Sequence, residues 1–428
     1  MKRSLPRAAA AAVAAVGAAL PFLVAGPVAL AAPADRPSSA PLAPSAPAVH
    51  IVQVHGTEAT REAVTERARQ LTADHGGELR RVYYAASQAF SVSLTEEQLA
   101  GYYRDTRVSS ITPDRVYRVA GLQHGGAVSA AAGGVQIWPP SWGLDRIDQR
   151  DLPLDGVYAF HGTGAGTHVY VVDTGVRTGH GEFAGRARGA YDAITPGPGG
   201  DGDCHGHGTA TAAIAAGRWT GVAKGATVES VRALGCDGTG TMEHIMSAVD
   251  WITANARRPA VVNLGFSGEP GSVLDLQLYE MTRKGIAYTA AAGNGDGSGN
   301  GIESCETTPA RQTTAITVAA TDRDDSRPAW SNYGYCVHLF APGTGITTAG
   351  SRGDRHYTGL SGTSAATAQV TGAAAVHLAE HPGATPEELD EALADAATED
   401  RVRDAGPDSR NLLLYTGRPE GTEGRGDR

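Results

Sequence analysis

The sequence predicts an α/β fold: a mostly parallel sheet with helices on both faces, preceded by a small α+β domain. The segment Thr167–Gly175 is an apolar, β-branched and aromatic run, which is typical of a strand buried on both faces. Further apolar runs alternate with segments of helical period, as expected of parallel strands joined by crossover helices. The region 49–119 has short alternating strands between charged helices, which predicts a separate domain.

The first residues have the pattern of a cleavable export signal. Lys2, Arg3 and Arg7 precede an Ala-, Val- and Leu-rich run, and Ala29-Leu30-Ala31 is an A-x-A cleavage site. We therefore expect a signal peptide at 1–31 and a secreted, extracellular protein. A membrane anchor is the alternative, and it is disfavoured because prolines interrupt the apolar run.

The small α+β domain is predicted at 49–119, after a Pro/Ser-rich linker at 32–48. Residues 120–134 form a second linker, Gly/Ala-rich from Gln123 to Gly134, which we expect to be exposed and cleavable. For the α+β domain at 49–119, an ordinary interaction domain is the alternative interpretation. The expected elements are a strand at His50–Val54, a helix at Glu58–Thr72, a strand at Phe90–Leu94, a helix opened by a capping box at Thr95 and a strand at Val108–Val119.

The larger domain is predicted at 135–416, followed by a flexible tail at 417–428. Met242, Ile245, Met246, Val249 and Ile252 form one apolar helix face, so the methionines belong to the core. Further elements are strands at Ala226–Ala233, Ala260–Phe266, Gly285–Ala290 and Asn411–Tyr415, and helices at Ser272–Lys284, Ser364–Glu380 and from Thr385-Pro386.

A Gly-Thr-Ser turn places Ser364 at the start of an Ala-rich helix. Free backbone N–H groups and the helix dipole favour negative charge there, so this serine is well placed as a nucleophile beside an oxyanion site. A plain helix cap is the alternative interpretation.

Two upstream motifs supply the partners that such a serine needs. Asp173 ends the buried strand, at the edge where open α/β sheets keep their functional crevices, although a strand-end turn residue is the simpler interpretation. His207 lies at or just before a helix start in Asp203–Thr209. Its His-x-His pattern beside a cysteine also allows a metal site, which is disfavoured because no further His or Cys has ligand spacing.

Asp173, His207 and Ser364 follow the chain order of subtilisin. The sequence resembles the subtilase family, and within it the secreted proteinase K and aqualysin branch, from about Pro139 to Thr416. The matching motifs are Trp142–Arg150, Asp173–Gly175, Cys204–Thr209, Val231–Gly240 and Ser331–Gly334.

The resemblance implies a subtilisin-like sheet and a serine endopeptidase that hydrolyses peptide bonds with an Asp-His-Ser triad. The region 49–119 resembles the subtilase propeptide, so the protein would be made as an autoprocessed zymogen inhibited by its own propeptide. By resemblance the mature chain starts near Val135, after a cut between Gly134 and Val135. A non-catalytic scaffold with the same fold is the alternative.

Asn294 follows the predicted strand in an Ala-Gly-Asn setting that the family uses for the oxyanion hole, with the Ser364 N–H as second donor. By resemblance, two segments flank an extended substrate strand and pair with its backbone. The second departs from the usual Ser-Leu-Gly, and a broad preference for apolar or aromatic residues before the cut is the default. The substrate-binding residues are Gly238, Thr239, Gly240, Gly265, Phe266, Ser267, Ala292 and Gly293.

Three alanines depart from the family pattern near the triad: Ala210 replaces the usual His, Ala365 the usual Met and Ala368 the usual Pro. Alanine is a strong helix former, so the helices are expected to persist, whereas the lost volume would loosen the triad. These departures keep the scaffold alternative open.

Four cysteines allow three pairings in an exported chain. The aqualysin-like branch places bridges where Cys204–Cys236 and Cys305–Cys336 would lie, and each would contribute about 3–4 kcal/mol in the chain-entropy model.

No cofactor is expected for the chemistry. Relatives hold calcium with a carboxylate where this chain has His338, a poor ligand for a hard ion, so we expect that site to be weakened, while Asp145 and Asp148 remain candidates for another. The net charge of −10 disfavours nucleic-acid binding. Extended polypeptides are the expected substrates, and the mature protein is expected to be a monomer without a membrane partner.

Overall fold

The computed structural model describes residues 46–125 and 134–417, all within one compact unit. The predicted signal peptide, most of the linker at 32–48 and nearly all of the tail at 417–428 lie outside the described residues. Among those that are described, no helix is both long enough and apolar enough to cross a membrane.

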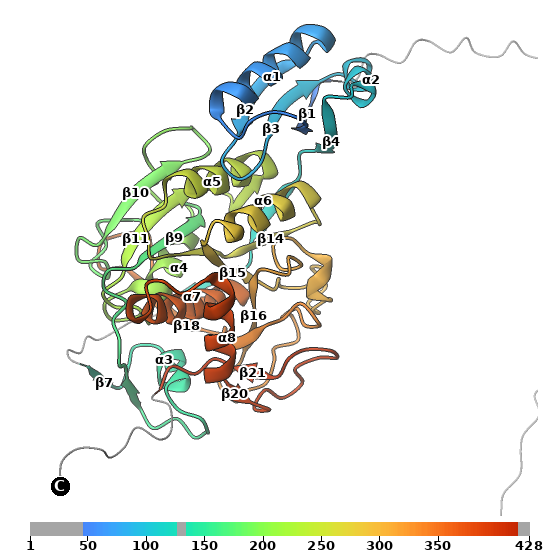
Figure 1. Ribbon diagram of the computed structural model, residues 1–428. Coiled ribbons are helices and arrows are strands. Elements are labelled where there is room, and N and C mark those ends of the chain that lie inside the picture. Colours follow the sequence, from blue (N-terminus) through green and yellow to red (C-terminus); the bar gives the residue numbers. More distant parts are fainter. Residues whose placement is uncertain (1–45, 126–133, 418–428) are drawn as a thin grey trace, which may run out of the picture. The chain divides into compact units, whose positions relative to one another are not determined.

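The N-terminal domain is an antiparallel sheet in the order β2-β3-β1-β4, with two helices on one face (Figure 1). Because side chains alternate along a strand, Val52 packs against these helices whereas its neighbour Ile51 joins the core of the following domain. The elements are β1 (Ala48–Val54), α1 (Arg61–His75), β2 (Glu78–Tyr83), β3 (Ala89–Leu94), α2 (Glu96–Arg104) and β4 (Val108–Pro113).

The second domain is built on a sheet in the order β10-β11-β9-β13-β15-β16-β17-β21-β20, parallel in the described residues except for the last pair. This is the mostly parallel α/β fold that the sequence predicts. The strands are β9 (His168–Asp173), β10 (Ala187–Asp192), β11 (Thr227–Arg232), β13 (Ala260–Leu264), β15 (Ala287–Ala291), β16 (Ile316–Thr321), β17 (Leu339–Pro342), β20 (Thr398–Glu399) and β21 (Leu412–Leu413).

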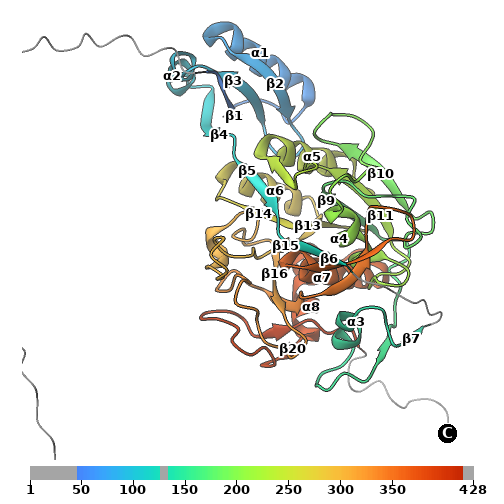
Figure 2. The same cartoon turned by 180° about the vertical axis from the view of Figure 1, so that it is seen from behind.

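Helices cover both faces of this sheet (Figures 1 and 2). Val169 and Val171 of β9 pack in one cluster with α4, α7 and α8, whereas Tyr170 and Val172 pack in another with α5 and α6. Burial on both faces explains the unbroken apolar run in this strand. The helices are α3 (Trp142–Ile147), α4 (His207–Ala216), α5 (Met242–Asn255), α6 (Ser272–Arg283), α7 (Thr363–Glu380) and α8 (Pro386–Ala396), with a 3₁₀ turn at Ser304–Glu306.

Smaller sheets join segments that are far apart in sequence. The strand β5 (Val116–Val119) lies between β12 (Thr239–Thr241) and β14 (Phe266–Gly268), antiparallel to both. The next strand, β6 (Leu122–Gly125), pairs with β19 (Tyr357–Ser361), which also pairs with β18 (Ile346–Ala349). A two-stranded sheet joins β7 (Val135–Ile137) to β8 (Val157–Ala159).

Most predicted elements are present with shifted ends, and three predictions require correction. The single strand expected at Val108–Val119 is wrong, because β4 and β5 belong to different sheets. Within the linker that was expected to be exposed, Gln123–Gly125 belong to strand β6, which pairs with β19. The strand expected at Asn411–Tyr415 is reduced to two residues, and β2 was not among the predicted elements.

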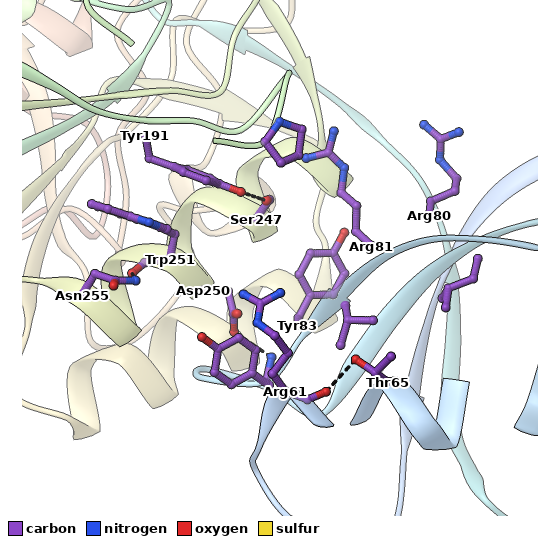
Figure 3. Close-up of a pocket in the computed structure, with 14 residues that line it drawn as sticks. Arg61, Thr65, Arg80, Arg81, Tyr83, Tyr191, Ser247, Asp250, Trp251 and Asn255 are labelled. Atoms are coloured by element: carbon purple, nitrogen blue, oxygen red, sulfur yellow. Dashed lines mark hydrogen bonds between the residues drawn. The ribbon is translucent and has the colours of Figure 1, made fainter. Parts of the chain in front are cut away.

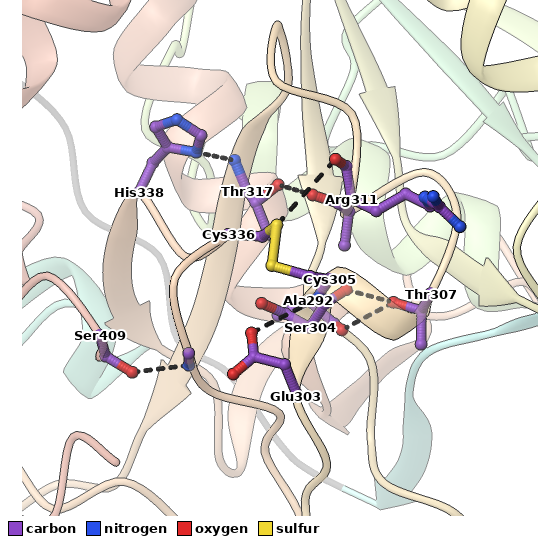
Figure 4. Close-up of a disulfide and its surroundings, with 12 residues drawn as sticks. Ala292, Glu303, Ser304, Cys305, Thr307, Arg311, Thr317, Cys336, His338 and Ser409 are labelled. Carbon is purple, nitrogen blue, oxygen red and sulfur yellow. Dashed lines mark hydrogen bonds between the residues drawn. A yellow bond between two sulfur atoms is a disulfide. The ribbon is translucent and has the colours of Figure 1, made fainter. Parts of the chain in front are cut away.

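All four cysteines of the sequence are paired as the resemblance implies, Cys204 with Cys236 and Cys305 with Cys336. The first bridge joins the loop before α4 to the segment before β12. The second, drawn in Figure 4, joins the 3₁₀ turn to the segment that leads into β17.

Candidate active site

Asp173 is the last residue of β9, and its carboxylate is fully buried. Both of its oxygens lie within hydrogen-bond distance of His207 Nδ1, at 2.8 and 2.9 Å. The backbone N–H of Thr174 and the hydroxyl of Thr211 donate to the same carboxylate, at 2.7 and 3.3 Å. These donors hold Asp173 in one orientation toward the imidazole.

His207 is the first residue of α4, as expected from the glycines around it. Gly206 caps the helix in the left-handed region with φ of 102°, a conformation that glycine adopts without strain. His207 Nε2 lies 2.9 Å from the hydroxyl of Ser364. The imidazole therefore connects Asp173 to Ser364 in one buried hydrogen-bonded chain.

Asp203 organises the loop that presents this histidine. One carboxylate oxygen accepts from the Thr174 hydroxyl (2.9 Å) and from the backbone N–H groups of His205 and Gly206 (3.2 and 2.6 Å). The other accepts from the N–H and hydroxyl of Thr209, at 2.8 and 2.6 Å. Asp203 begins the Asp203–Thr209 motif, and an acidic residue before a Gly-rich turn is a usable sequence signal for this role, which was not among the predictions.

Ser364 is the second residue of α7, so its backbone N–H is one of the free donors at a helix start. This N–H donates to the carbonyl oxygen of Ala120, at 3.1 Å. The residue after Ala120 also lies close to the serine side chain, since a Cβ added at Gly121 would come 2.5 Å from the Ser364 hydroxyl oxygen.

The side chain of Asn294 is oriented by its neighbour on α7. Its Oδ1 accepts from the N–H and the hydroxyl of Thr363, at 3.0 and 2.9 Å, which leaves the Nδ2 group as the donor of this side chain. Asn332 supports the same loop, because its Oδ1 accepts from the N–H groups of Gly295 and Ile302 at 2.9 Å each. Asn332 lies within the Ser331–Gly334 motif, whose sequence does not indicate this supporting position.

The predicted substrate-binding segments form the two walls of a groove, which strand β5 fills. Thr239–Thr241 pairs with Arg118–Val116 on one side and Phe266–Gly268 with Val119–Tyr117 on the other. Beyond the ladders, the N–H of Val119 donates to Gly238 O and the N–H of Ala120 to Gly265 O, each at 3.0 Å. Gly293 lies beside this wall, since a Cβ added there would come 3.4 Å from the Ser267 hydroxyl.

Alternate side chains of β5 point into and out of the groove. Tyr117 is fully buried, edge-on to Phe266 with ring centroids 6.1 Å apart, and its hydroxyl donates to Glu269 O at 3.3 Å. A Cβ added at Gly268 or Gly271 would collide with the tyrosine, so both glycines make room for it. Arg118, by contrast, is exposed.

The N-terminal sheet is held on helix α5 by charged contacts. The buried carboxylate of Glu243 accepts from Arg80 at 2.8 and 3.0 Å and from the Ser91 hydroxyl at 2.7 Å. Asp250 Oδ1 accepts from three successive backbone N–H groups at 84–86, at 2.7–3.0 Å. Figure 3 shows Asp250 at a cavity of about 390 Å³ between this helix and the N-terminal sheet.

The three alanines that depart from the family pattern are fully buried in the core cluster around α4 and α7. The hydrogen bonds between the triad residues are nevertheless complete. Each alanine lies within a regular helix, Ala210 in α4 and the other two in α7, as the helix propensity of alanine predicts.

Among the described residues, no group of three or more His, Cys, Asp or Glu side chains is arranged to hold a metal ion. His338 is engaged with β16, since its Nδ1 accepts from the Thr317 N–H at 3.3 Å, and burial lowers the pKa of its imidazole. Asp148 is different, because in the described part of the chain its buried Oδ1 has no hydrogen-bond partner, and burial raises its pKa to about 7.

Comparison with known families agrees with this geometry. The profile of the Subtilase family matches residues 164–412, more than half of the sequence, and that of Peptidase inhibitor I9 matches 42–120. The chain belongs to the subtilase family. This subtilase is a subtilisin-like serine endopeptidase with an inhibitor I9 propeptide, which is the N-terminal α+β domain described above.

Three similar proteins illustrate the relationship. An extracellular serine proteinase of Thermus sp. (strain Rt41A) is 43% identical, over 80% of this chain and 78% of that protein. Alkaline serine exoprotease A of Vibrio alginolyticus is 35% identical, over 78% of this subtilase and 60% of the exoprotease. The crystal structure of a cold adapted subtilisin-like serine proteinase has a TM-score of 0.62 and 41% identity, covering 65% of this chain and 98% of that one.

Proposed function

We propose that Ser364 is the nucleophile of this endopeptidase, His207 its general base and acid, and Asp173 the group that orients the imidazole. The observation that supports this most is the hydrogen-bonded chain between the three side chains, with a peptide carbonyl held beside it. Ser364 Oγ would attack the carbonyl carbon while His207 Nε2 takes its proton, and Asp173 would stabilise the imidazolium that forms.

The developing oxyanion would be stabilised by two donors. The Ser364 N–H already binds a peptide carbonyl oxygen, at 3.1 Å. The Nδ2 group of Asn294 would be the second donor, since Thr363 fixes the opposite end of that amide. Donors held in place before the reaction need no reorganisation when the charge appears.

Extended polypeptides are the proposed substrates, bound as a strand between β12 and β14 in the manner of β5. The buried Tyr117 of β5 predicts that substrates have an aromatic residue at P4, the fourth position before the cut. Ala120 suggests a small residue directly before the cut, at P1. This refines the default of a broad apolar or aromatic preference at P1.

A comparison of wild type with Ser364→Ala, and with Ser272→Ala as a matched exposed control, tests the proposal. Hydrolysis of a peptide anilide and conversion of the zymogen to shorter chains are measured on the same samples. Removal of the nucleophile is expected to lower kcat by about 10⁶-fold and to leave the zymogen uncut. Equal hydrolysis by wild type and Ser364→Ala would refute the assignment, and a fully inactive wild type would favour the non-catalytic scaffold.

Secretion is proposed from the N-terminal export pattern and from the extracellular relative. Mass spectrometry of protein from the culture medium of a secreting host tests it, because the mature form should lack residues 1–31. Protein that stays in the cell with this segment attached would contradict it.

A structural calcium ion is proposed at Asp145 and Asp148, not at His338. Among the described residues the buried Oδ1 of Asp148 has no hydrogen-bond partner, and burial raises the pKa values of both Asp145 and Asp148, with a smaller contribution from the charge of Asp155. Oxygen donors suit this hard cation, and backbone carbonyls and water would complete its shell. The imidazole of His338 does not fit such an ion. Calorimetric titration with calcium, on wild type and Asp148→Asn in an inactive background, tests this assignment.

A further inference from the structure

We propose that the zymogen first cuts itself between Ala120 and Gly121, and that residues 121–125 then stay in the groove as a strand that competes with substrate. This inference rests on the proposed function, because it requires Ser364 to be the nucleophile. It replaces the cut between Gly134 and Val135 that the resemblance implies.

The backbone of Ala120 is held as a substrate would be. Its N–H donates to Gly265 O at 3.0 Å, and its carbonyl oxygen accepts from the Ser364 N–H at 3.1 Å. The N–H of Val119, the residue before it, donates to Gly238 O, and the two residues before that, Arg118 and Tyr117, pair with both groove walls. The strand before the Ala120–Gly121 peptide bond is therefore held by the groove walls, and the carbonyl oxygen of that bond is held by the Ser364 N–H.

Gly121 fits the triad only because it has no side chain. A Cβ added there would come 2.5 Å from the Ser364 hydroxyl oxygen and 3.1 Å from His207 Nε2. Gly362 is matched to the same peptide, since its Cβ would lie 2.1 Å from the Ala120 carbonyl oxygen. Two glycines in distant parts of the chain thus allow one particular peptide bond to approach the serine.

The bond between Gly134 and Val135 lies in a different setting. The carbonyl of Gly134 accepts from the Phe160 N–H at 3.2 Å, and Val135 begins strand β7, which pairs with β8. A Cβ added at Gly134 would meet nothing closer than the Phe160 carbonyl oxygen at 4.0 Å. Its hydrogen bond and strand pairing involve β8 and Phe160, not the triad.

The proposed step follows from the positions of the atoms. The Ser364 hydroxyl adds to the Ala120 carbonyl carbon, the bond to the Gly121 nitrogen breaks, and His207 passes the serine proton to the leaving amine. Water then attacks the acyl-serine, with His207 as base, which frees the Ala120 carboxylate and restores the serine. The products are a propeptide that ends at Ala120 and a chain that begins at Gly121.

The new amine does not diffuse away, because it is part of the same chain and its strand is paired. Leu122, Gln123, His124 and Gly125 of β6 face Ser361, Leu360, Gly359 and Thr358 of β19 in antiparallel register. The β19 strand runs directly into Gly362 and Ser364, so β6 occupies the groove on the far side of the cut. A peptide that extends beyond its own scissile bond must displace this strand.

The first test identifies the initial cut by intact mass spectrometry of both fragments during maturation of the full chain. A propeptide ending at Ala120 and a partner beginning at Gly121 should appear before any other pair. A first cut elsewhere, including at Gly134–Val135, overturns the inference while leaving Ser364 as nucleophile. Loss of all cutting in Ser364→Ala separates this question from the proposed function.

Matched valine variants sharpen the same test. Gly121→Val crowds the triad and should slow the first cut roughly 100-fold, the factor expected for a misplacement of about 1 Å at the reacting atoms. Gly134→Val has open space and should mature at the wild-type rate. Slowing by Gly134→Val alone contradicts the assignment. The wild-type mass measurement remains decisive if Gly121→Val fails to fold.

The retained strand is tested by comparing two substrates on the isolated chain that begins at Gly121. For a peptide that spans the cut, the KM of this chain should be about tenfold above the KM of a second chain from which 122–125 have been deleted. This factor is expected if the retained strand competes at about 1 mM effective concentration with a Kd near 0.1 mM. The KM for an anilide that ends at the cut should be unchanged. Equal KM values for the long peptide would refute the retained strand.

Discussion

The buried tyrosine of β5 allows one prediction to be worked out in numbers. A substrate with the sequence of 117–120, Tyr-Arg-Val-Ala, places tyrosine at P4, and replacing it by alanine empties the site that Tyr117 fills. Tyr117 is fully buried against Phe266 in the zymogen. An aromatic side chain buries about 150–250 Å², which at about 25 cal/mol per Å² gives an upper estimate of about 4–6 kcal/mol.

The realised loss should be smaller, because alanine still covers part of the site and a free peptide already shields some of its tyrosine. Burial of a whole large side chain contributes about 1.5–3 kcal/mol in practice. Taking about 2–3 kcal/mol of transition-state binding, we expect kcat/KM to fall about 30- to 150-fold.

The assay compares three anilides that end at the cut: Tyr-Arg-Val-Ala, Ala-Arg-Val-Ala and Tyr-Ala-Val-Ala. The third changes the position of Arg118, which is exposed in the zymogen, and should alter kcat/KM less than about threefold. A P4 effect no larger than this control would show that β5 does not represent a bound substrate, and the reasoning from its burial would be refuted.

Three further predictions follow from other parts of the structure. Asn294→Ala should lower kcat about 10²- to 10³-fold with little change in KM, as steady-state kinetics would show, because it would remove the oxyanion donor proposed above. Glu243→Gln should speed release of the cleaved propeptide about 5- to 150-fold, because the charge-assisted hydrogen bond from the partly exposed Arg80 contributes about 1–3 kcal/mol. The rate of release is measured from the lag before full activity. Without calcium, the melting temperature should fall as pH rises from about 4 to about 7, because native Asp148, with a pKa of about 7, keeps a proton that the unfolded chain has lost. Thermal unfolding of Ser364→Ala with chelator, with and without Asp148→Asn, checks that this slope disappears.

Much of the catalytic domain was predictable because its signals are local. The apolar run before Asp173, the glycines around His207 and the Ala-rich helix after Ser364 each specify a short element by themselves. Parallel strands bring their carboxyl ends to one edge of a sheet. The chain order of the three residues and the resemblance then sufficed to expect one site.

The parts that sequence reasoning missed depend on pairing between distant segments. Within the stretch from Val108 to Val119, Pro113 and Asp114 are a local sign of a break, but they do not show that the second half leaves the propeptide sheet for the groove. Asp203 likewise has five hydrogen-bond contacts that exist only after its loop has folded. The motif identified the right loop without showing which residue holds it.

In the proposed maturation, inhibition and processing would use the same strand, β5, so their strengths would be coupled. The contacts that hold Tyr117 and Ala120 before the cut also hold the propeptide after it, because only the bond to Gly121 is broken. Tyr117→Ala should therefore slow the first cut and, once the cut has occurred, shorten the lag before full activity. A variant that slows cutting without faster release would mean that the propeptide is retained mainly by its sheet on α5, through Glu243 and Asp250, rather than by β5.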